Sequence, residues 1–476
     1  MIPVTGFDGQ TVGILGLGRT GLATAQALRA GGATPVAWDD GEAAREAAAG
    51  DGITLVDFAS EPWPGLACLV VSPGIPHLYP APHPVIAKAW GEGVPVDNDI
   101  GLFFQSCPDA KVVAITGTNG KSTTTALIRH LLAETGRAVQ MGGNIGTAVL
   151  ALNPPSPGET IVLELSSYQI DLARCLTPDI AVFLNLAPDH LDRHGGMGGY
   201  FNAKRRLFAV GHPPLSVIGV DEAEGRFLAN EMRLGRDPGD SVIAISATRP
   251  LGGRGRSVAL RDGNLAVIDS GNVVHIVRLA DLSPALAGLH NAQNAAAAIA
   301  VATTLDVPAA AIAKGLSSYP GLPHRMQPVG RLGPVRIIND SKATNPEAAA
   351  QSIASFDQVL WIGGGQAKEA GLGALEDELH RIRHAYLIGA AMEDLATALE
   401  GRVPVTRSGT LDRAVQDAAA EAQRIMKQDP QAGPVLLLAP ACASFDQFKD
   451  YEHRGRMFMD LVATLDDVAP AAEAVT

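Results

Sequence analysis

The stretch from Lys111 to Thr125, KVVAITGTNGKSTTT, constrains the fold of this chain more than any other segment. Its apolar start is typical of a buried parallel strand, and residues 122–134 can form a helix. The glycine loop between them can direct backbone N–H groups and the positive end of the helix dipole at a phosphate. Lys121 could reach the terminal phosphates and the Ser122 hydroxyl could ligate magnesium. Because Ile115 stands where the first glycine of the usual longer loop would be, a plain strand-to-helix turn remains an alternative.

Length and composition set broad limits. At 476 residues the chain is too long for one core, and at about 150 residues per domain we expect three domains. Hydrophobic residues at 46% and charged residues at 18% indicate a globular protein. The net charge of -13 argues against a nucleic-acid-binding surface. The sequence lacks a signal-peptide pattern and an apolar run of about 18 residues, so we expect no membrane insertion and a cytoplasmic protein.

The N-terminal region predicts a Rossmann-type unit. A strand signal at Thr11–Leu15 precedes Gly16–Gly21, which has the G-x-G-x-x-G pattern before an Ala/Leu-rich helix. Asp39 ends the next strand, where a dinucleotide-binding fold presents an acid to a ribose. Ser72–Ile75 forms another turn after a third strand. Taken alone, these features favour NAD, with ordinary α/β turns as the alternative.

Downstream of the phosphate loop, the strand Ile161–Leu165 carries Glu164 at its end. An acid one strand from a phosphate loop is placed to bind the same magnesium ion. His190, in the loop after the next strand, could bind a metal or a phosphate, although a single histidine is more often structural. Short β runs between residues 211 and 281, including Val242–Ser246, predict a β lobe on the central unit.

A third α/β unit follows Pro320, with strands that include Val435–Leu438. We expect the Ala-rich tail after Asp466 to be frayed.

Eight motifs in order carry a resemblance over nearly the whole chain: GTNGKST, GGNIG, ELSSYQ, DHLDRH, HNAQN, GLPHR, NDSKATN and PACASFDQF. In this combination the sequence resembles the Mur ligases. The resemblance implies an α/β protein of three domains: a Rossmann-like UDP-binding domain (1–99), a central P-loop ATPase-like α/β domain with an extra β lobe (100–320), and a Rossmann-like amino-acid-binding domain (321–476). The G-x-G-x-x-G turn would then hold UDP and not NAD.

The implied activity is an ATP- and Mg²⁺-dependent ligase of peptidoglycan precursor synthesis. It would join D-glutamate to UDP-N-acetylmuramoyl-L-alanine through an acyl phosphate, act as a monomer, and have these small molecules as its partners. Near alternatives are folylpolyglutamate synthase or a sister Mur ligase with another amino acid, from which PACASFDQF and Lys368 would distinguish it. From other classes, an NAD-dependent oxidoreductase or a nucleotide-binding regulatory protein without turnover remains open.

The resemblance also assigns roles to individual residues. Those for ATP are Gly117, Thr118, Asn119, Gly120, Lys121, Ser122, Thr123, Asn294, His324, Arg325 and Asp340. Those for the UDP substrate are Gly18, Arg19, Thr20, Asp39, Ser72, Gly74, Asn144, Ser166, Gln169 and His190. Those for D-glutamate are Thr344, Lys368, Ser444 and Tyr451. The implied metal ligands are Ser122, Glu164, His190 and Lys204, and the implied catalytic residues are Lys121, His190, Lys204 and Lys342.

Lys204 matches a lysine that Mur ligases carry as an N-carboxylated side chain. The alternative is a solvated lysine, because a lysine that is followed by two arginines on an expected helix is usually on a solvated face. A carbamate would replace a positive charge with a hard oxygen ligand that suits magnesium. Its formation requires the neutral amine, hence a pKa lowered by burial or by neighbouring cations.

Overall fold

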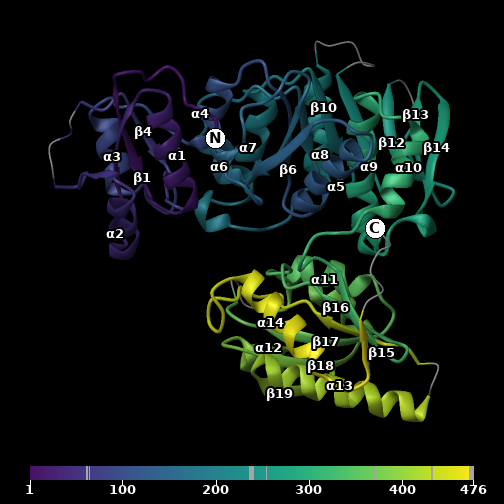
Figure 1. Cartoon of the computed structure of the whole chain (residues 1–476). Coiled ribbons are helices and arrows are strands. Elements are labelled where there is room, and N and C mark those ends of the chain that lie inside the picture. Colours follow the sequence, from purple (N-terminus) through teal and green to yellow (C-terminus); the bar gives the residue numbers. More distant parts are fainter. Residues whose placement is uncertain are drawn as a thin grey trace. The chain divides into compact units, whose positions relative to one another are not determined.

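The computed structural model describes residues 1–60, 63, 65–234, 241–252, 255–367, 371–429 and 432–470. The chain divides into two compact units, Met1–Arg278 with Gln293–Gly315, and Leu279–Ala292 with Leu316–Thr476. The first unit contains two sheets and the second contains one, each accompanied by helices (Figure 1). The predicted α/β class is therefore confirmed, with three sheets, while the boundaries of the three domains stay predictions.

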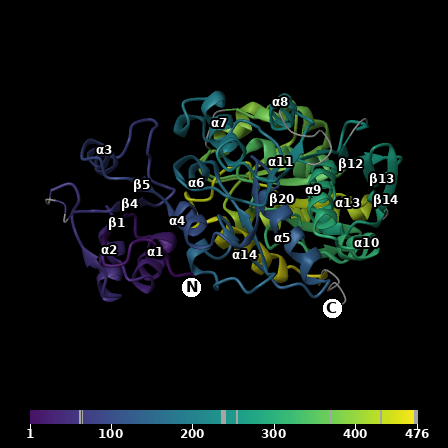
Figure 2. The same cartoon turned by 90° about the horizontal axis from the view of Figure 1, so that it is seen from above.

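The first sheet has the strand order β3-β2-β1-β4-β5 and is parallel throughout. Its strands are β1 (Thr11–Leu15), β2 (Thr34–Trp38), β3 (Thr54–Leu55), β4 (Cys68–Val71) and β5 (Val96–Asp97). Its helices are α1 (Arg19–Ala30), α2 (Glu42–Gly50), α3 (Pro84–Gly91) and α4 (Asp99–Ser106). Figures 1 and 2 show α1 and α3 on opposite sides of the strands. Because the strand order reverses between β1 and β4, the loops after these strands open a crevice at their carboxyl ends.

The central sheet has the order β14-β13-β12-β11-β10-β9-β6-β8-β7. Its strands are β6 (Lys111–Thr116), β7 (Val139–Gly143), β8 (Thr160–Glu164), β9 (Ile180–Phe183), β10 (Leu215–Gly219), β11 (Val242–Ser246), β12 (Arg256–Arg261), β13 (Asn264–Asp269) and β14 (Asn272–Arg278). The helices that follow or connect them are α5 (Lys121–Ala133), α6 (Ser167–Leu172), α7 (Met197–Ala209), α8 (Ala223–Arg233), α9 (Leu289–Thr304) and α10 (Ala309–Ser318). The strands predicted as a β lobe thus continue the central sheet, with β12 to β14 as an antiparallel edge.

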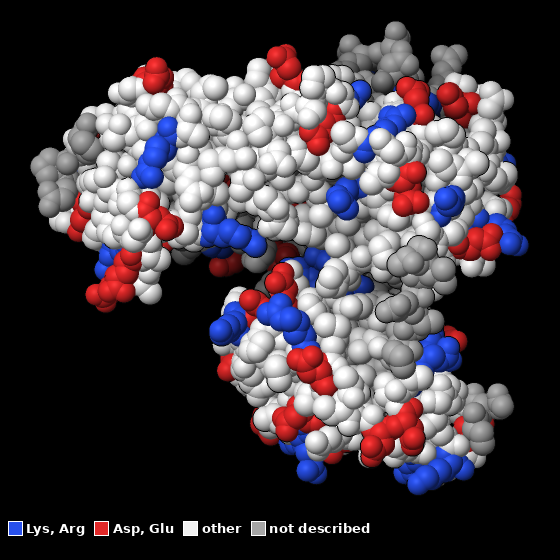
Figure 3. Space-filling model, viewed as in Figure 1, with Lys and Arg blue, Asp and Glu red and all other residues white. Residues whose placement is uncertain are grey.

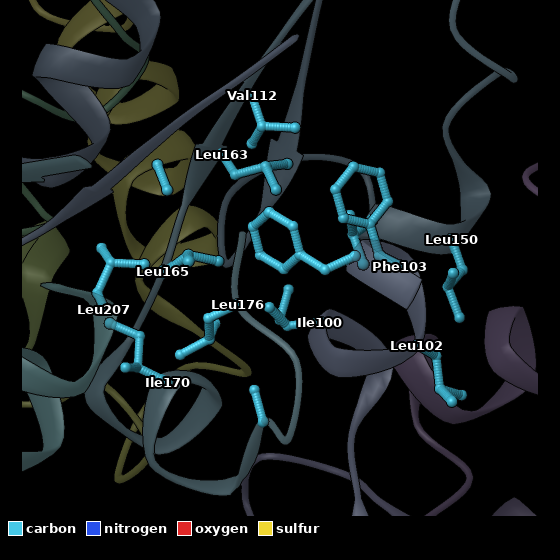
Figure 4. Packing of buried hydrophobic residues seen from close by; sticks show 14 of the residues in the cluster. Ile100, Leu102, Phe103, Val112, Leu150, Leu163, Leu165, Ile170, Leu176 and Leu207 are labelled. Carbon is cyan, nitrogen blue, oxygen red and sulfur yellow. The ribbon is translucent and has the colours of Figure 1, made fainter. Parts of the chain in front are cut away.

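Apolar packing links these elements. Phe103 of α4, Val112 of β6, Leu163 of β8 and Leu207 of α7 lie in one cluster, and none is more than 1% exposed (Figure 4). Each such buried side chain contributes about 1.5–3 kcal/mol relative to an exposed one. Val112 is the second residue of β6, so this cluster packs against the strand that leads into the phosphate loop.

The third sheet has the order β19-β18-β17-β20-β16-β15-β21. Its strands are β15 (Gln327–Leu332), β16 (Val335–Asn339), β17 (Val359–Gly364), β18 (Ile382–Ile388), β19 (Val405–Gly409), β20 (Val435–Leu438) and β21 (Val468–Pro470). Its helices are α11 (Pro346–Ala354), α12 (Met392–Leu399), α13 (Leu411–Gln428) and α14 (Tyr451–Ala463). The expectation of a frayed tail is wrong for β21, because its backbone pairs antiparallel with β15.

Charges are mixed on the surface. On the face shown in Figure 3, the described acidic and basic side chains are interspersed. In the described part of the chain, no helix combines the length and the apolar character needed to cross a membrane.

Candidate active site

The phosphate loop lies between β6 and α5. Gly117 and Gly120 have φ angles of +152° and +83°, which side chains rarely adopt, and α5 begins at Lys121. A Cβ on Gly120 would lie 2.1 Å from Oδ1 of Asn294. The loop therefore needs glycine at residue 120 for its backbone angle and for the space that Asn294 occupies.

The loop is held from the side of β9. Asn185, just past β9, accepts Thr118 N–H through its backbone oxygen at 3.0 Å and Asn119 N–H through its side-chain oxygen at 2.9 Å. Its side-chain N–H₂ donates to Gln293 Oε1 at 3.0 Å. Asn294 in turn accepts the Thr124 hydroxyl at 3.2 Å. Sequence reasoning missed Asn185 and Gln293, although a polar residue just after a buried strand is a usable signal.

Two lysines lie at the loop. Lys121 Nζ donates to the carbonyl oxygens of Gly117 and Thr118 at 3.0 and 2.7 Å. Lys204 Nζ donates to the same Gly117 oxygen at 2.8 Å and lies 4.5 Å above the Tyr200 ring. Lys204 is 1% exposed. Burial, followed by the nearby charge of Lys121, holds the pKa of Lys204 well below its ordinary value.

Hard oxygen atoms meet beside the loop. The Ser122 hydroxyl donates to one oxygen of Glu164, and Asn144 Nδ2 donates to the other at 2.8 Å. The described residues contain no cluster of three or more His, Cys, Asp or Glu side chains able to hold a metal. A hydroxyl beside one carboxylate nevertheless fits magnesium, which takes one or two carboxylates and completes its shell with phosphate and water oxygens.

His190 lies in a left-handed backbone conformation with φ of 54°. Its Nε2 is 3.5 Å from Asp189, its side chain is 40% exposed, and its ring lies 5.3 Å from the ring of Tyr168. Ser166 and Gln169 form the reciprocal capping box that starts α6. These two residues therefore have a structural role in addition to the one predicted for them.

A second histidine, His194, was not singled out in the sequence. Its buried ring stacks on Tyr168 at 5.2 Å, and its Nε2 lies 2.9 Å from the Ser167 hydroxyl. Asp171, 3.9 Å from its Nδ1, also contacts His77 at 3.0 Å. Burial lowers the pKa of His194 to about 4, so it is neutral near pH 7 and anchors the loop that carries His190.

A pocket of about 330 Å³ occupies the crevice of the first sheet. Six of the residues predicted for the UDP substrate are among its lining residues: Gly18, Arg19, Thr20, Asp39, Ser72 and Gly74. The two carboxylate oxygens of Asp39 accept the N–H groups of Leu17 at 2.6 Å and Gly41 at 2.8 Å. Asp39 thus holds the backbone of the Gly16–Gly21 turn in place.

In the second unit, predicted residues gather after β16. Asp340 is buried and accepts Met326 N–H at 3.2 Å and the Ser352 hydroxyl. Burial raises the pKa of Asp340, opposed by these bonds and by the charge of Arg325. His324 is buried beside Asn339 at 3.1 Å, and burial lowers its pKa.

Lys342 Nζ lies 4.0 Å from the centre of the Tyr451 ring, and Thr344 N–H donates to the Lys342 carbonyl at 2.8 Å. Ser444 is buried in the loop after β20. Lys368 lies outside the described residues.

Arg454 of α14 joins two of these loops. It is completely buried, and its guanidinium donates to the carbonyl oxygens of Ser341 at 2.9 Å and Cys442 at 3.1 Å. It also donates to the Ser341 hydroxyl at 3.0 Å. Sequence reasoning missed it, because an arginine in a helix rich in charged residues gives no local sign of burial.

Residues 115–302 match the family model of the Mur ligase middle domain, and residues 324–442 match that of the Mur ligase glutamate ligase domain. UDP-N-acetylmuramoylalanine--D-glutamate ligase of Cereibacter sphaeroides is 53% identical over 475 residues, which cover 98% of this chain and 100% of that protein. The enzyme of the same name from Ruegeria pomeroyi is 53% identical over 473 residues, covering 96% and 98%.

Solved structures are similar at lower identity. UDP-N-acetylmuramate-alanine ligase from Thermotoga maritima superposes with a TM-score of 0.55 at 17% identity, covering 95% of this chain and 98% of that one. MurF from Acinetobacter baumannii gives 0.54 at 18% identity, covering 96% and 91%. At such identities these matches show a shared fold.

Proposed function

Because this chain belongs to the Mur ligase family, we propose that it is an ATP-dependent ligase that joins D-glutamate to UDP-N-acetylmuramoyl-L-alanine in peptidoglycan precursor synthesis. The observation that carries the proposal is 53% identity, over nearly the whole chain, to two enzymes named for this reaction. The phosphate loop, with its two lysines and a hydroxyl–carboxylate pair, supplies the groups that the chemistry requires.

The reaction needs an activated acid, because a carboxylate and an amine do not condense usefully in water. The carboxylate oxygen of the UDP substrate attacks the γ-phosphorus of ATP, and ADP leaves. The amine of D-glutamate, having lost a proton, then attacks the acyl carbon, and the C–O bond to phosphate breaks. Exclusion of water protects the acyl phosphate during these steps.

The phosphate loop would bind ATP through its backbone N–H groups, with Asn185 and Asn294 fixing its shape. Lys121 would exchange its two loop carbonyl contacts for phosphate oxygens. Ser122 and Glu164 would hold Mg²⁺, with His190 as a ligand for a second ion. Bound magnesium would offset negative charge on the transferring phosphoryl group.

Lys204 supports a more specific proposal, namely that it carries a carbamate. Its amine is buried, its contacts are the Gly117 carbonyl and the Tyr200 ring, and its lowered pKa favours the neutral form that reacts with carbon dioxide. An ammonium here would repel metal ions near Glu164, whereas a carbamate would attract or orient them.

We assign the binding residues of the other substrates according to the sheet near which they lie. The pocket at the carboxyl edge of the first sheet would take the UDP end, with Asn144, Ser166 and Gln169 nearer the reacting group. His324, Arg325, Asp340 and Lys342 would complete the nucleotide and phosphate contacts. Thr344, Lys368, Ser444 and Tyr451 would bind D-glutamate. We further propose a monomer that acts in the cytoplasm, with domains at residues 1–99, 100–320 and 321–476.

One assay tests the proposal. ADP release is measured with UDP-N-acetylmuramoyl-L-alanine and Mg²⁺, with D-glutamate, L-glutamate, L-lysine or no amino acid added. We expect release with D-glutamate, and almost none from the Lys121→Ala variant, which should still bind the UDP substrate. A preference for another amino acid would indicate a sister ligase. NAD binding with no ADP release under any condition would contradict the ligase assignment.

A further inference from the structure

A second large pocket, of about 460 Å³, lies beside α8 and outside the candidate active site. It arises from the way β11 and β12 are joined. These strands are parallel, and such neighbours usually require a helical crossover. The described part of this connection, 247–252 and 255, forms no helix. It leaves open a volume between α8 and the strand residues Ala244 and Ser257.

Four of the described residues that line this pocket are arginines, although the chain as a whole carries a net charge of -13. Arg226 and Arg233 come from α8, Arg249 from the loop after β11, and Arg256 from the start of β12. None of the described lining residues is acidic. Where the described lining residues supply no counter-charge, gathering four cations around one volume is unfavourable unless an anion can enter.

Two described acidic residues near the pocket, Asp221 and Glu231, are engaged elsewhere. Asp221 accepts the hydroxyl groups of Ser246 at 2.6 Å and Thr248 at 2.7 Å, and the Gln293 amide at 2.8 Å. These bonds fix the beginning of the loop that closes the pocket. Glu231 of α8 pairs with Arg205 of α7. Neither of these two acids therefore neutralises the pocket arginines, whereas Glu222 lies near enough to Arg226 for their charges to interact.

The guanidinium groups themselves are available. Arg226 donates through Nη1 to the carbonyl oxygens of Val220 at 3.1 Å and Asp221 at 2.7 Å, which holds it at the pocket. The side chains of Arg233, Arg249 and Arg256 make no ion pair or hydrogen bond with any described residue. Guanidinium forks bind the oxygens of phosphate groups in a bidentate manner.

We propose that this pocket is a binding site for a small molecule with two or more phosphate groups, separate from the ATP site. Its volume lies in the range of small-molecule sites. Three arginines that have no ion pair with any described residue match a ligand of several negative charges better than a single carboxylate. An amino acid is excluded, because no described lining residue offers a carboxylate to its ammonium group. The phosphate loop follows β6, which is separated from β11 by β9 and β10, so the two sites are distinct.

The test measures the binding of inorganic pyrophosphate to the whole chain. Binding is measured by calorimetry at low ionic strength and without divalent metals. The Lys121→Ala variant removes the phosphate-loop contribution, and a second change, Arg233→Gln with Arg256→Gln, is made on that background. We expect pyrophosphate to bind the Lys121→Ala protein, and the added pocket substitutions to weaken this binding at least tenfold. The matched control is Arg261→Gln with Arg331→Gln, which removes the same charge from exposed residues and should change binding less than twofold.

Binding measurements with other ligands identify the chemical class of the natural ligand. A sugar monophosphate should bind more weakly than pyrophosphate, and ADP should bind the Lys121→Ala protein if the natural ligand is a nucleotide. Citrate binding as tightly as pyrophosphate would overturn the assignment to phosphate. Absence of pyrophosphate binding to the Lys121→Ala protein, or equal losses in the pocket and control variants, would overturn the site. Ligase turnover with saturating substrates should be unchanged in Arg233→Gln/Arg256→Gln, so the outcome is independent of the proposed function.

Discussion

Replacing Gly120 with alanine tests how far the phosphate loop depends on the contact between this glycine and Asn294. The added Cβ would lie 2.1 Å from Asn294 Oδ1, in a backbone with φ of +83°. Asn294 is only 2% exposed, and the same Oδ1 accepts the Thr124 hydroxyl, so the amide cannot move aside without losing this bond. We expect about 1–2 kcal/mol from the left-handed backbone and a further ~1–2 kcal/mol from the displaced amide.

Gly136→Ala is the matched control. Gly136 follows α5 with φ of +75°, and an added Cβ there would have nothing within 4 Å. Both variants share the backbone cost, but only Gly120→Ala displaces Asn294. Native-state hydrogen exchange of α5 amides should show a loss of about 2–4 kcal/mol in Gly120→Ala and about 1–2 kcal/mol in the control. Calorimetry should show at least tenfold weaker ATP binding in Gly120→Ala alone.

Equal losses of stability and of ATP affinity in the two variants would refute this reasoning, because the backbone angle alone would then account for both. The double variant Gly120→Ala/Asn294→Ala provides a second check. Removing the amide eliminates the close contact, so the two substitutions should cost less together than the sum of each alone.

Three further changes have expected outcomes. Burial raises the pKa of Asp99 from 3.8 to about 7, so the folded state holds this proton more tightly and stability is lost as the pH rises through the folded pKa. Denaturant unfolding at several pH values measures the free energy of unfolding of the parent protein and of Asp99→Asn. The variant should be the more stable of the two from about pH 4 upward, by on the order of 4 kcal/mol near pH 8. A stability difference that does not change with pH would contradict this expectation. Lys204→Ala should lose most ligase activity and regain part of it with added formate, whereas Lys204→Arg should not be rescued. Arg454→Met should destabilise the second unit by on the order of 3 kcal/mol, because buried carbonyl groups lose their donor, while Arg456→Met, at a half-exposed site, should have little effect on the unfolding midpoint.

Strand prediction succeeded where the signal was local. Thr11–Leu15, Val242–Ser246 and Val435–Leu438 have the predicted bounds, because short β-branched or leucine-rich runs end at polar residues, glycine or proline. β7 ends in Gly142 and Gly143, which are typical of turns and gave no strand signal; the pairing of these residues with β8 overrides that preference. β12 was missed because it begins with arginine and its role is set by its neighbours in the sheet.

The residues of the candidate site also fall into those with a local sequence signal and those without one. The phosphate loop, Glu164 and Lys204 could be predicted because reactive residue types follow strands or recur in known motifs. His194 and Arg454 could not, because their partners are distant in the chain; Arg454, for example, contacts a hydroxyl 113 residues away. Such residues act by holding backbone groups in place, and the sequence around them contains no trace of that role.

The position of β20 has a consequence for the order of events during synthesis. β16 and β17 are neighbours in the sequence, yet each pairs with β20, which lies between them in the sheet. Until residues 435–438 have left the ribosome, both strands present unpaired backbone edges, and the sheet that carries Asp340 and Ser444 cannot close. We therefore expect the second unit to fold after translation is nearly complete. Chains released early, before residue 435, should be recognised by chaperones or degraded, even though their first unit can already have folded.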